Sequence, residues 1–293
     1  MKRLSIYLLL FTFLISFLAS AQEQEVKISV NPVNGKVFML IGQGGNIGLL
    51  VGSEKTLMID DQFARLSDKI LQAIKTVSSN PVSYLLNTHW HGDHTGSNSN
   101  IGKTGAVIVS HENVRKRLAD AQKEKNENDP DALPEITFAD GLSFHFEDEQ
   151  IMFFHSHAGH TDGDAMVYFV NSNVLHTGDL FFNGRYPYID LNSGGSALGY
   201  IKAVENALKI INDDTKIIPG HGNLATKKDY QDFLTMLKYL EKNITEAIAA
   251  GKSEEEIIND DTLTEKYDAL NFGSGFINSQ RIRQIFYTSL SKG

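Results

Sequence analysis

The sequence contains no cysteine. This absence excludes disulfide bonds, thiol nucleophiles, a lipidated N-terminal cysteine and every metal site that uses thiolate ligands. Any bound metal must therefore be held by His, Asp and Glu. A chain of 293 residues can fold without disulfides, because it is long enough to bury a large hydrophobic core.

After residues 2 and 3, Lys and Arg form no run longer than three residues, and the formal net charge is −9. A protein that binds nucleic acid must neutralise phosphates, so this charge pattern argues against a nucleic-acid partner and favours a small-molecule substrate. The 41% content of hydrophobic residues excludes wholesale disorder. Residues 22–293 lack a linker rich in Pro, Gly and Ser, which predicts a single domain over this range.

The first 21 residues have the pattern of a secretory signal peptide. Lys2 and Arg3 precede an apolar run from residue 4 to residue 18, and Ala19-Ser20-Ala21 forms a cleavage signature. An uncleaved anchor is the alternative, but the run is short for a span of ~20 residues. We therefore expect a periplasmic or secreted protein without stable membrane insertion after cleavage. Loss of residues 1–21 changes the net charge to −11.

Two hydrophobic patterns alternate along the rest of the chain. Short apolar runs bounded by Gly, Asn and Pro predict strands, and apolar residues at steps of three and four predict helices. Strands are expected at 37–41, 47–51, 56–59, 82–86, 106–109, 142–146, 151–154, 166–170, 174–175 and 216–218. Helices are expected at 63–77, 112–125, 198–211, 226–248 and around 282–286. Clusters of strands separated by helices predict a layered α/β domain.

Potential metal ligands crowd the segment that follows strand 82–86. His89 and His91 are two residues apart, so they face the same side of an extended segment. A glycine then permits a turn before Asp93 and His94. Imidazole and carboxylate together suit Zn²⁺ best, while Fe and Mn remain open. The alternative is a chance cluster on a solvated loop, but such a cluster beside an apolar strand favours a metal site.

The run from residue 89 to residue 94 resembles the H-x-H-x-D-H signature of the metallo-β-lactamase superfamily. Three further residues match the family ligands in order: His160 in Gly-His-Thr-Asp-Gly, Asp179 in His-Thr-Gly-Asp and His221 in Pro-Gly-His-Gly. The resemblance covers essentially the whole chain after residue 21. It implies an αββα sandwich, in which two mixed β-sheets are flanked by helices and the site lies at one open edge.

The resemblance also implies a dinuclear metallohydrolase with two Zn²⁺ ions. The first ion would be held by His89, His91 and His160, and the second by Asp93, His94 and His221, with Asp179 bridging both. Two cations roughly 3.5–4 Å apart lower the pKa of a shared water, so a bridging hydroxide would be the nucleophile. Asp93 would hold this hydroxide and carry a proton to the leaving group.

Two positions depart from the best-known secreted β-lactamases of the family. Asp179 stands where those enzymes have Cys, and Phe182 stands where they have a Lys that binds the drug carboxylate. An Asp at the bridging position resembles the glyoxalase II, lactonase and other hydrolase branches instead. In the next loop, we expect Arg185 to bind a substrate carboxylate or phosphate, with Tyr186 or Tyr188 lining the pocket.

These observations predict a hydrolase of a carbonyl-type bond in a cyclic amide such as a β-lactam, a lactone or an ester. Two alternatives remain open: a glyoxalase II-like thioesterase or a phosphoesterase, and a metal-binding protein without turnover. The complete ligand set argues against the last one. The sequence leaves the oligomeric state and the role of residues 250–293 open.

The remaining histidines and a pair of aspartates have weaker assignments. His157 and His176 each precede a family ligand by three residues, so each is a candidate for orienting a ligand, with a purely structural role as the alternative. His155 is a weaker candidate for the same role, and a surface or helix-end position is expected for His111 and His145. Asp60 and Asp61 close strand 56–59, where the family often has a structural aspartate.

Overall fold

The computed structural model describes residues 25–291. The expected signal peptide, residues 1–21, lies outside the described residues. Within residues 25–291, no helix combines the length and the hydrophobicity needed to span a bilayer.

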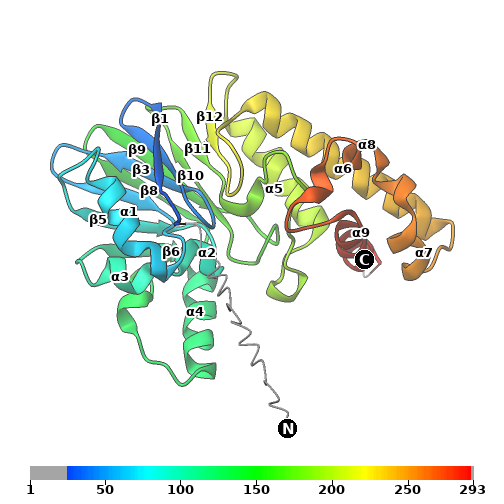
Figure 1. The fold of residues 1–293 in the computed structure, drawn as a ribbon, viewed down its shortest axis with the longest axis horizontal. Helices are drawn as coiled ribbons and strands as arrows, with labels where there is room; N and C mark the ends of the chain where they lie inside the picture. The colour runs from blue at the N-terminus through cyan, green and yellow to red at the C-terminus, as the bar shows by residue number, and fades with distance from the viewer. Residues whose placement is uncertain (1–24, 292–293) are drawn as a thin grey trace, which may run out of the picture.

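The strands form two β-sheets (Figure 1). The first has the strand order β1-β2-β3-β4-β5-β6-β7. Its strands are β1 (Ser29–Asn34), β2 (Val37–Ile41), β3 (Ile47–Val51), β4 (Thr56–Ile59), β5 (Val82–Asn87), β6 (Val107–His111) and β7 (Ile136–Phe138). Neighbours from β1 to β4 are antiparallel, and those from β4 to β7 are parallel. The sheet is therefore mixed, and β2, β3 and β4 occupy the ranges expected for strands at 37–41, 47–51 and 56–59.

The second sheet has the order β13-β12-β11-β10-β9-β8. Its strands are β8 (Gly141–Phe146), β9 (Glu149–His155), β10 (Ala165–Phe169), β11 (Val174–His176), β12 (Lys216–Ile218) and β13 (Ala225–Thr226). Only the β11–β12 pair is parallel among these strands. The inner faces of the two sheets meet in one core, to which Leu57, Leu86 and Val109 contribute from the first sheet and Phe153 and Val167 from the second.

Helices cover the outer face of each sheet, which completes the αββα sandwich expected from the sequence. Near the first sheet lie α1 (Ser67–Ile74), α3 (Asn98–Gly102) and α4 (Glu112–Glu124), and near the second lie α5 (Ala197–Ile210) and α6 (Lys227–Ala249). Burial on both faces explains why β3 and β4 are almost continuously apolar instead of alternating. Thr226 caps α6 and forms a capping box with Asp229.

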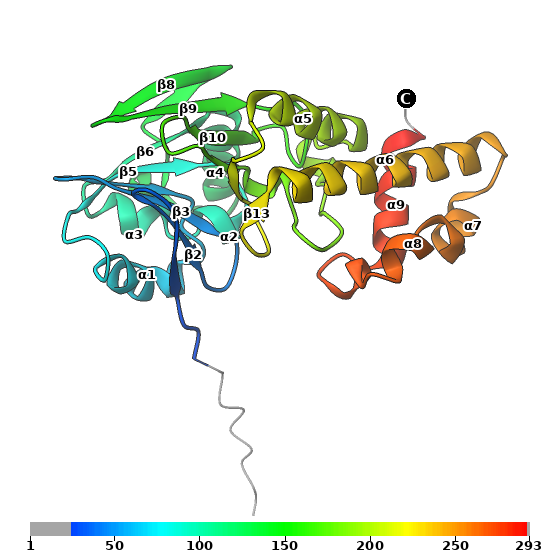
Figure 2. The same ribbon diagram turned by 90° about the horizontal axis from the view of Figure 1, so that it is seen from above.

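A helical region follows α6 and extends to one side of the sheets (Figure 2). It contains α7 (Glu254–Asn259), α8 (Glu265–Asp268) and α9 (Ser279–Leu290). α9 packs on α5, α6 and α7 through an apolar stripe that includes Ile282 and Phe286. Arg283 of α9 is fully buried, and its guanidinium donates hydrogen bonds to Ile258 O, Thr264 Oγ1 and Asp261 Oδ1.

Candidate metal centre

The potential ligands lie where strands of both sheets end. His89 and His91 follow β5, and the short helix α2 (Gly92–Thr95) carries Asp93 and His94. The second sheet contributes His160 after β9, Asp179 after β11 and His221 after β12. Carboxyl ends of strands on a rigid scaffold are common positions for functional loops. All seven residues named from the sequence thus meet at one end of the sandwich.

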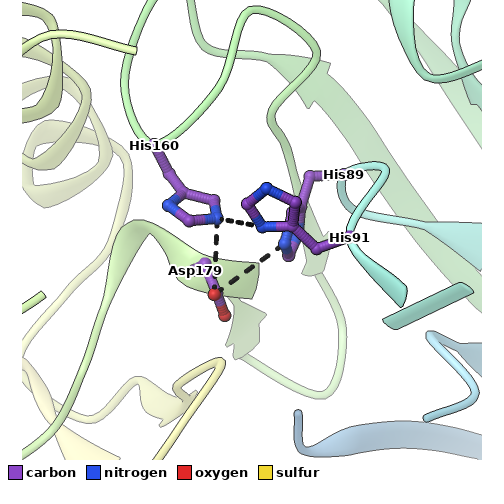
Figure 3. A group of neighbouring side chains, drawn as sticks. All are labelled: His89, His91, His160 and Asp179. Carbon is purple, nitrogen blue, oxygen red and sulfur yellow. Dashed lines mark hydrogen bonds and ion pairs between the residues drawn. The ribbon is translucent and has the colours of Figure 1, made fainter. Parts of the chain in front are cut away.

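One group consists of His89, His91, His160 and Asp179, whose potential ligand atoms all lie within 4.8 Å of one another. Figure 3 shows these side chains pointing toward a common centre. His91 Nδ1 lies 2.8 Å from His160 Nε2. Asp179 Oδ2 lies 3.5 Å from His160 Nε2 and 3.8 Å from His89 Nε2. Three imidazoles and one carboxylate oxygen therefore surround one position.

A second group beside it consists of Asp93, His94 and His221. Asp93 Oδ2 lies 3.3 Å from His221 Nε2 and 3.7 Å from His94 Nε2. The other oxygen of Asp179, Oδ1, lies 3.0 Å from His94 Nε2 and 3.4 Å from His221 Nε2. Asp179 thus turns one carboxylate oxygen toward each group, which is the arrangement of a bridging ligand.

Buried atoms without partners test whether these residues fit a metal. Among the described residues, His89 Nε2, His94 Nε2 and Asp179 Oδ1 are buried without a hydrogen-bond partner. Nearly all buried polar atoms in proteins have one, so atoms left without a partner around a shared centre fit cation ligands. The nitrogen and oxygen donors suit a divalent metal. Gly220 permits this close packing, since a Cβ there would lie 2.1 Å from Asp179 Oδ1.

Asp60 holds one of the imidazoles in place. Its Oδ2 lies 2.7 Å from His94 Nδ1 and also accepts a hydrogen bond from Thr88 Oγ1, while Oδ1 accepts one from the Thr88 backbone N–H. His94 therefore has Nδ1 engaged and Nε2 directed at the centre. The structural aspartate expected at position 60 therefore has a defined role, because Asp60 fixes the ring orientation of His94, a potential ligand.

Two further contacts of this kind come from the loop after Asp179, and neither is evident in the sequence. Asp190 Oδ2 accepts a 3.0 Å hydrogen bond from His91 Nε2. The backbone oxygen of Tyr188 accepts a 2.8 Å hydrogen bond from His160 Nδ1. Since Asp190 lies 99 residues from His91, no local pattern points to this pair. The contact forms only when the loop after β5 packs against the loop after Asp179.

The two groups differ in charge before a metal binds. In the first, burial lowers the pKa of His89, and it lowers the pKa of His160 to about 4, so both rings are neutral. In the second, burial alone would lower the pKa of His94 and His221. The nearby carboxylates outweigh this effect, chiefly Asp179, and raise the pKa of His221 to about 9. The first group is thus ready to ligate, whereas the second must lose protons.

The other histidines lie around the centre and not in it. His176 is buried, and its Nδ1 accepts a hydrogen bond from the backbone N–H of Gly178, which helps to orient the turn before Asp179. His157, the other candidate for orienting a ligand, contacts His155 instead. A sharp turn at Ala158, with φ +49°, separates it from His160, and its Nδ1 lies 3.1 Å from His155 Nε2.

His155 in turn stacks on His111, with ring centroids 3.8 Å apart. His111 caps the N-terminus of α4, as expected for a helix-end residue, but it is buried and not at the surface. Its side chain points inward because strand β6 continues to this residue before α4 begins. His145 is exposed on β8, in agreement with the expectation.

A cavity of about 500 Å³ opens next to both groups. Its lining includes Asp93 and Asp179 from the centre and Arg185 from the loop after it. Tyr186 also contributes to the wall, but its hydroxyl donates a 2.8 Å hydrogen bond to Asp268 Oδ1 and is buried. Tyr188 stacks on His91 at a centroid distance of 5.9 Å. Of the two tyrosines considered from the sequence, Tyr186 is thus engaged with the C-terminal helices and Tyr188 stands beside a ligand.

Comparisons with known proteins agree with this geometry. The profile of the metallo-beta-lactamase superfamily matches residues 40–221. A hydroxyacylglutathione hydrolase of Pelagibacter ubique is 32% identical over 146 residues, which cover 48% of this chain and 52% of that protein, so the match spans about half of its length. A beta-lactamase-like protein 2 homolog of Caenorhabditis elegans is 25% identical over 228 residues, 77% of this chain and 71% of that protein.

A metallo-beta-lactamase from Pontibacter korlensis has a similar structure, with a TM-score of 0.61 over 72% of this chain and 99% of that chain. At 19% identity this similarity shows the fold alone. The family profile covers β3 through His221, and it therefore includes every one of the seven residues at the centre. On this match, the two-sheet sandwich and the order of the ligand residues, the chain belongs to the metallo-beta-lactamase superfamily.

Proposed function

We propose that this protein is an exported, zinc-dependent hydrolase with two metal ions, which opens a carbonyl-type bond in a cyclic amide such as a β-lactam, a lactone or an ester. The observation that carries the proposal is the Asp179 carboxylate, with one oxygen toward each group of potential ligands at the edge of an open cavity. Metal ions held there would polarise a substrate carbonyl and lower the pKa of a water.

The position of Asp93 supports a role in proton transfer. Its carboxylate lines the cavity and stands next to His94 and His221. Burial alone would raise the pKa of Asp93, but these two histidines outweigh it and hold the pKa below its usual value. Asp93 is therefore ionised at neutral pH and can accept a proton from the attacking water and return it to the leaving group.

Arg185 supplies the positive partner for an anionic substrate. It lines the cavity, is half-buried, and takes part in no ion pair or side-chain hydrogen bond among the described residues. A guanidinium of this kind can bind a carboxylate with two parallel hydrogen bonds. Phe182 cannot do so, because a phenyl ring carries neither a positive charge nor a hydrogen-bond donor; it is stacked on His221 at a centroid distance of 4.9 Å.

A thioesterase is the second candidate. It is favoured by the Pelagibacter ubique relative, named as a hydroxyacylglutathione hydrolase, and by the aspartate at position 179. Export weighs against it, since the glutathione thioester is a cytosolic compound. Phosphoester hydrolysis has no such supporting observation, and the complete set of ligand residues disfavours a metal-binding protein without turnover.

One screen tests the proposed activity. The chain without residues 1–21 is loaded with Zn²⁺ and assayed against a chromogenic cephalosporin, lactones, aryl esters, a hydroxyacylglutathione and a phosphodiester. An Asp179→Asn variant prepared in parallel controls for contaminating hydrolases. We expect turnover of a β-lactam, lactone or ester that the variant lacks. Exclusive turnover of the thioester would replace the first candidate with the second, and turnover of none would leave a metal-binding protein.

Export requires a separate experiment. Residues 1–25 are fused to a reporter enzyme that is active only outside the cytoplasm, and a variant with Lys2→Glu and Arg3→Glu serves as the matched control. We expect reporter activity and processing after Ala21 for the native segment, and a large loss for the variant. An inactive native fusion would contradict export.

A further inference from the structure

Part of the cavity lining comes from a distant part of the chain. Phe276 and Ile277 line the cavity together with residues of the metal centre such as Asp93 and Asp179. Both belong to the segment between α8 and α9. This segment, residues 272–277, is called the C-terminal wall below. It lies well beyond residues 40–221, the range that matches the family profile. The lining therefore combines residues of the family core with residues of the C-terminal helical region.

Specific contacts fasten the C-terminal wall to the loop that carries Arg185. The backbone N–H of Tyr186 donates a 3.2 Å hydrogen bond to the oxygen of Phe272, and the ring of Tyr186 packs on that of Phe272. The Tyr186 hydroxyl bonds to Asp268 at the end of α8. Asp268 in turn accepts a hydrogen bond from Ser279 at the start of α9. Both ends of the C-terminal wall are thus held in place.

The side chains at this wall are apolar. Ile277 is buried, whereas 85% of the surface of Phe276 is exposed, the largest value among the exposed hydrophobic residues of the described chain. The ring of Phe276 nevertheless has a defined position, edge-on to Tyr188 with centroids 5.9 Å apart. A large exposed aromatic group at the mouth of a cavity is typical of a ligand-binding surface.

Charge is scarce on the same side. Arg185 is the one basic side chain other than histidine among the described residues that line the cavity. It approaches the C-terminal wall closely, since a Cβ at Gly275 would lie 3.6 Å from Arg185 Cδ. A single cation beside an aromatic and aliphatic surface matches a ligand with one anionic group and one apolar group, and it offers little to a ligand with several polar groups.

We propose that Phe276, Ile277 and Tyr188 form an apolar subsite that takes an aryl or branched alkyl substituent of the substrate, while Arg185 binds a carboxylate next to it. The proposal rests on the proposed function, because it assigns the substrate class of the same site. The substrate is then an amphiphilic carboxylic acid derivative, and Phe276 determines specificity for its apolar part.

Binding of product-like acids tests the subsite without turnover. The zinc-loaded protein is titrated calorimetrically with 4-phenylbutyrate and with butyrate, which differ only in the phenyl group. We expect 4-phenylbutyrate to bind at least about tenfold more tightly, in keeping with burial of an aromatic ring. Phe276→Ala should reduce this ratio to about threefold or less, and Phe276→Leu should retain most of it.

Leu270→Ala is the matched control. Leu270 is also an exposed apolar residue of the C-terminal region, at 61% exposure, but it does not line the cavity. We expect this variant to keep the wild-type ratio. A wild-type ratio near one, an unchanged ratio in Phe276→Ala, or an equal loss in both variants would overturn the subsite. Melting temperatures of the variants show whether a loss of binding reflects unfolding.

A kinetic arm separates failure of the subsite from failure of the proposed function. Aryl esters of acetic and phenylacetic acid share a leaving group and differ in the apolar substituent. We expect Phe276→Ala to raise KM for the phenylacetyl ester about five- to tenfold, with kcat and the acetyl ester nearly unchanged. Absence of turnover with a normal binding ratio would refute the hydrolase and keep the subsite. Turnover without discrimination between the esters would do the reverse.

Discussion

Asp190 accepts a hydrogen bond from Nε2 of His91, on the side of the imidazole that faces away from the metal centre. The ring therefore presents Nδ1 to the centre. Burial alone would raise the pKa of Asp190, but the hydrogen bonds from His91 and Ser193 outweigh it and hold the pKa well below its usual value. The carboxylate is thus ionised, and it fixes both the tautomer and the orientation of His91.

Replacement of Asp190 by Ala should therefore weaken zinc binding at the first group by about 10–100-fold. The affinity can be measured by competition with a chromophoric chelator. Asp190→Asn keeps an acceptor for Ser193 and serves as the milder comparison, with a smaller loss expected. Wild-type zinc affinity in Asp190→Ala would show that packing alone orients His91.

Two metal equivalents per chain are expected when the protein is prepared with excess zinc, because the seven residues divide into two groups that share Asp179. His221→Ala removes a potential ligand of the second group only, and it should reduce the content to about one equivalent. Elemental analysis measures both values. A wild-type content that never exceeds one equivalent, with no change in His221→Ala, would remove the second site.

Zinc binding at the two groups should depend differently on pH. The pKa of His221 is raised to about 9, so a metal must displace a proton there at every pH below that value. The pKa of His94 is raised as well, so affinity at the second group should rise by at least about tenfold per pH unit between pH 6 and 9. The pKa of His160 is lowered to about 4, so this ring has no proton to lose in the same range. Chelator competition at pH 6.5, 7.5 and 8.5 checks the contrast, and parallel slopes for both sites would contradict it.

Asp93→Asn should lower kcat by about 10²–10⁴-fold and change KM much less, since general acid–base groups contribute rate factors of this size. The amide keeps the shape of the side chain but cannot accept a proton. Zinc content must be measured in the same preparation, because Asp93 also lies within reach of His94 and His221. A kcat within about threefold of wild type at full zinc content would assign the proton transfer to another group.

Arg185→Ala should reduce kcat/KM for a carboxylate-bearing substrate. The loss should correspond to about 1–3 kcal/mol of transition-state stabilisation, the range for losing a charge-assisted hydrogen bond. A matched neutral ester should react almost as before. Comparison of the two substrates in steady-state assays distinguishes the possibilities. Equal losses would indicate that Arg185 supports its loop, and no loss on either substrate would place it in solvent.

The sequence could predict those residues of the centre that lie in short, local motifs. His89, His91, Asp93 and His94 form one short motif after an apolar strand, so their type and spacing can be read without a structure, whereas His160, Asp179 and His221 were assigned from the resemblance to the family signature. The contact between His91 and Asp190 joins residues 99 positions apart, and that between Tyr186 and Asp268 joins residues 82 apart. Neither leaves a local pattern, because both arise only when the elements pack.

The same distinction applies to the fold. The buried strands β2 to β6 were predictable because their apolar runs are continuous, whereas the edge strand β1 is polar and exposed and gives no such signal. β7 has only three residues, mostly exposed, and was missed for the same reason. The helix expected at 63–77 is confined to α1, after a 3₁₀ turn at Ala64–Leu66. The single domain expected over 22–293 stays a prediction.

The metal centre draws His89, His91, Asp93 and His94 from one sheet and the remaining ligands from the other, and these sheets form separate hydrogen-bonded ladders. Asn46 reinforces the junction, since its side-chain amide donates to the oxygens of Pro219 and Gly222 on either side of His221. A bound ion would cross-link the two sheets and so stabilise their packing. Loss of the metal would then destabilise the fold as well as abolish activity. When the metal is scarce, proteases would degrade the protein faster, and the protein that remains would be inactive.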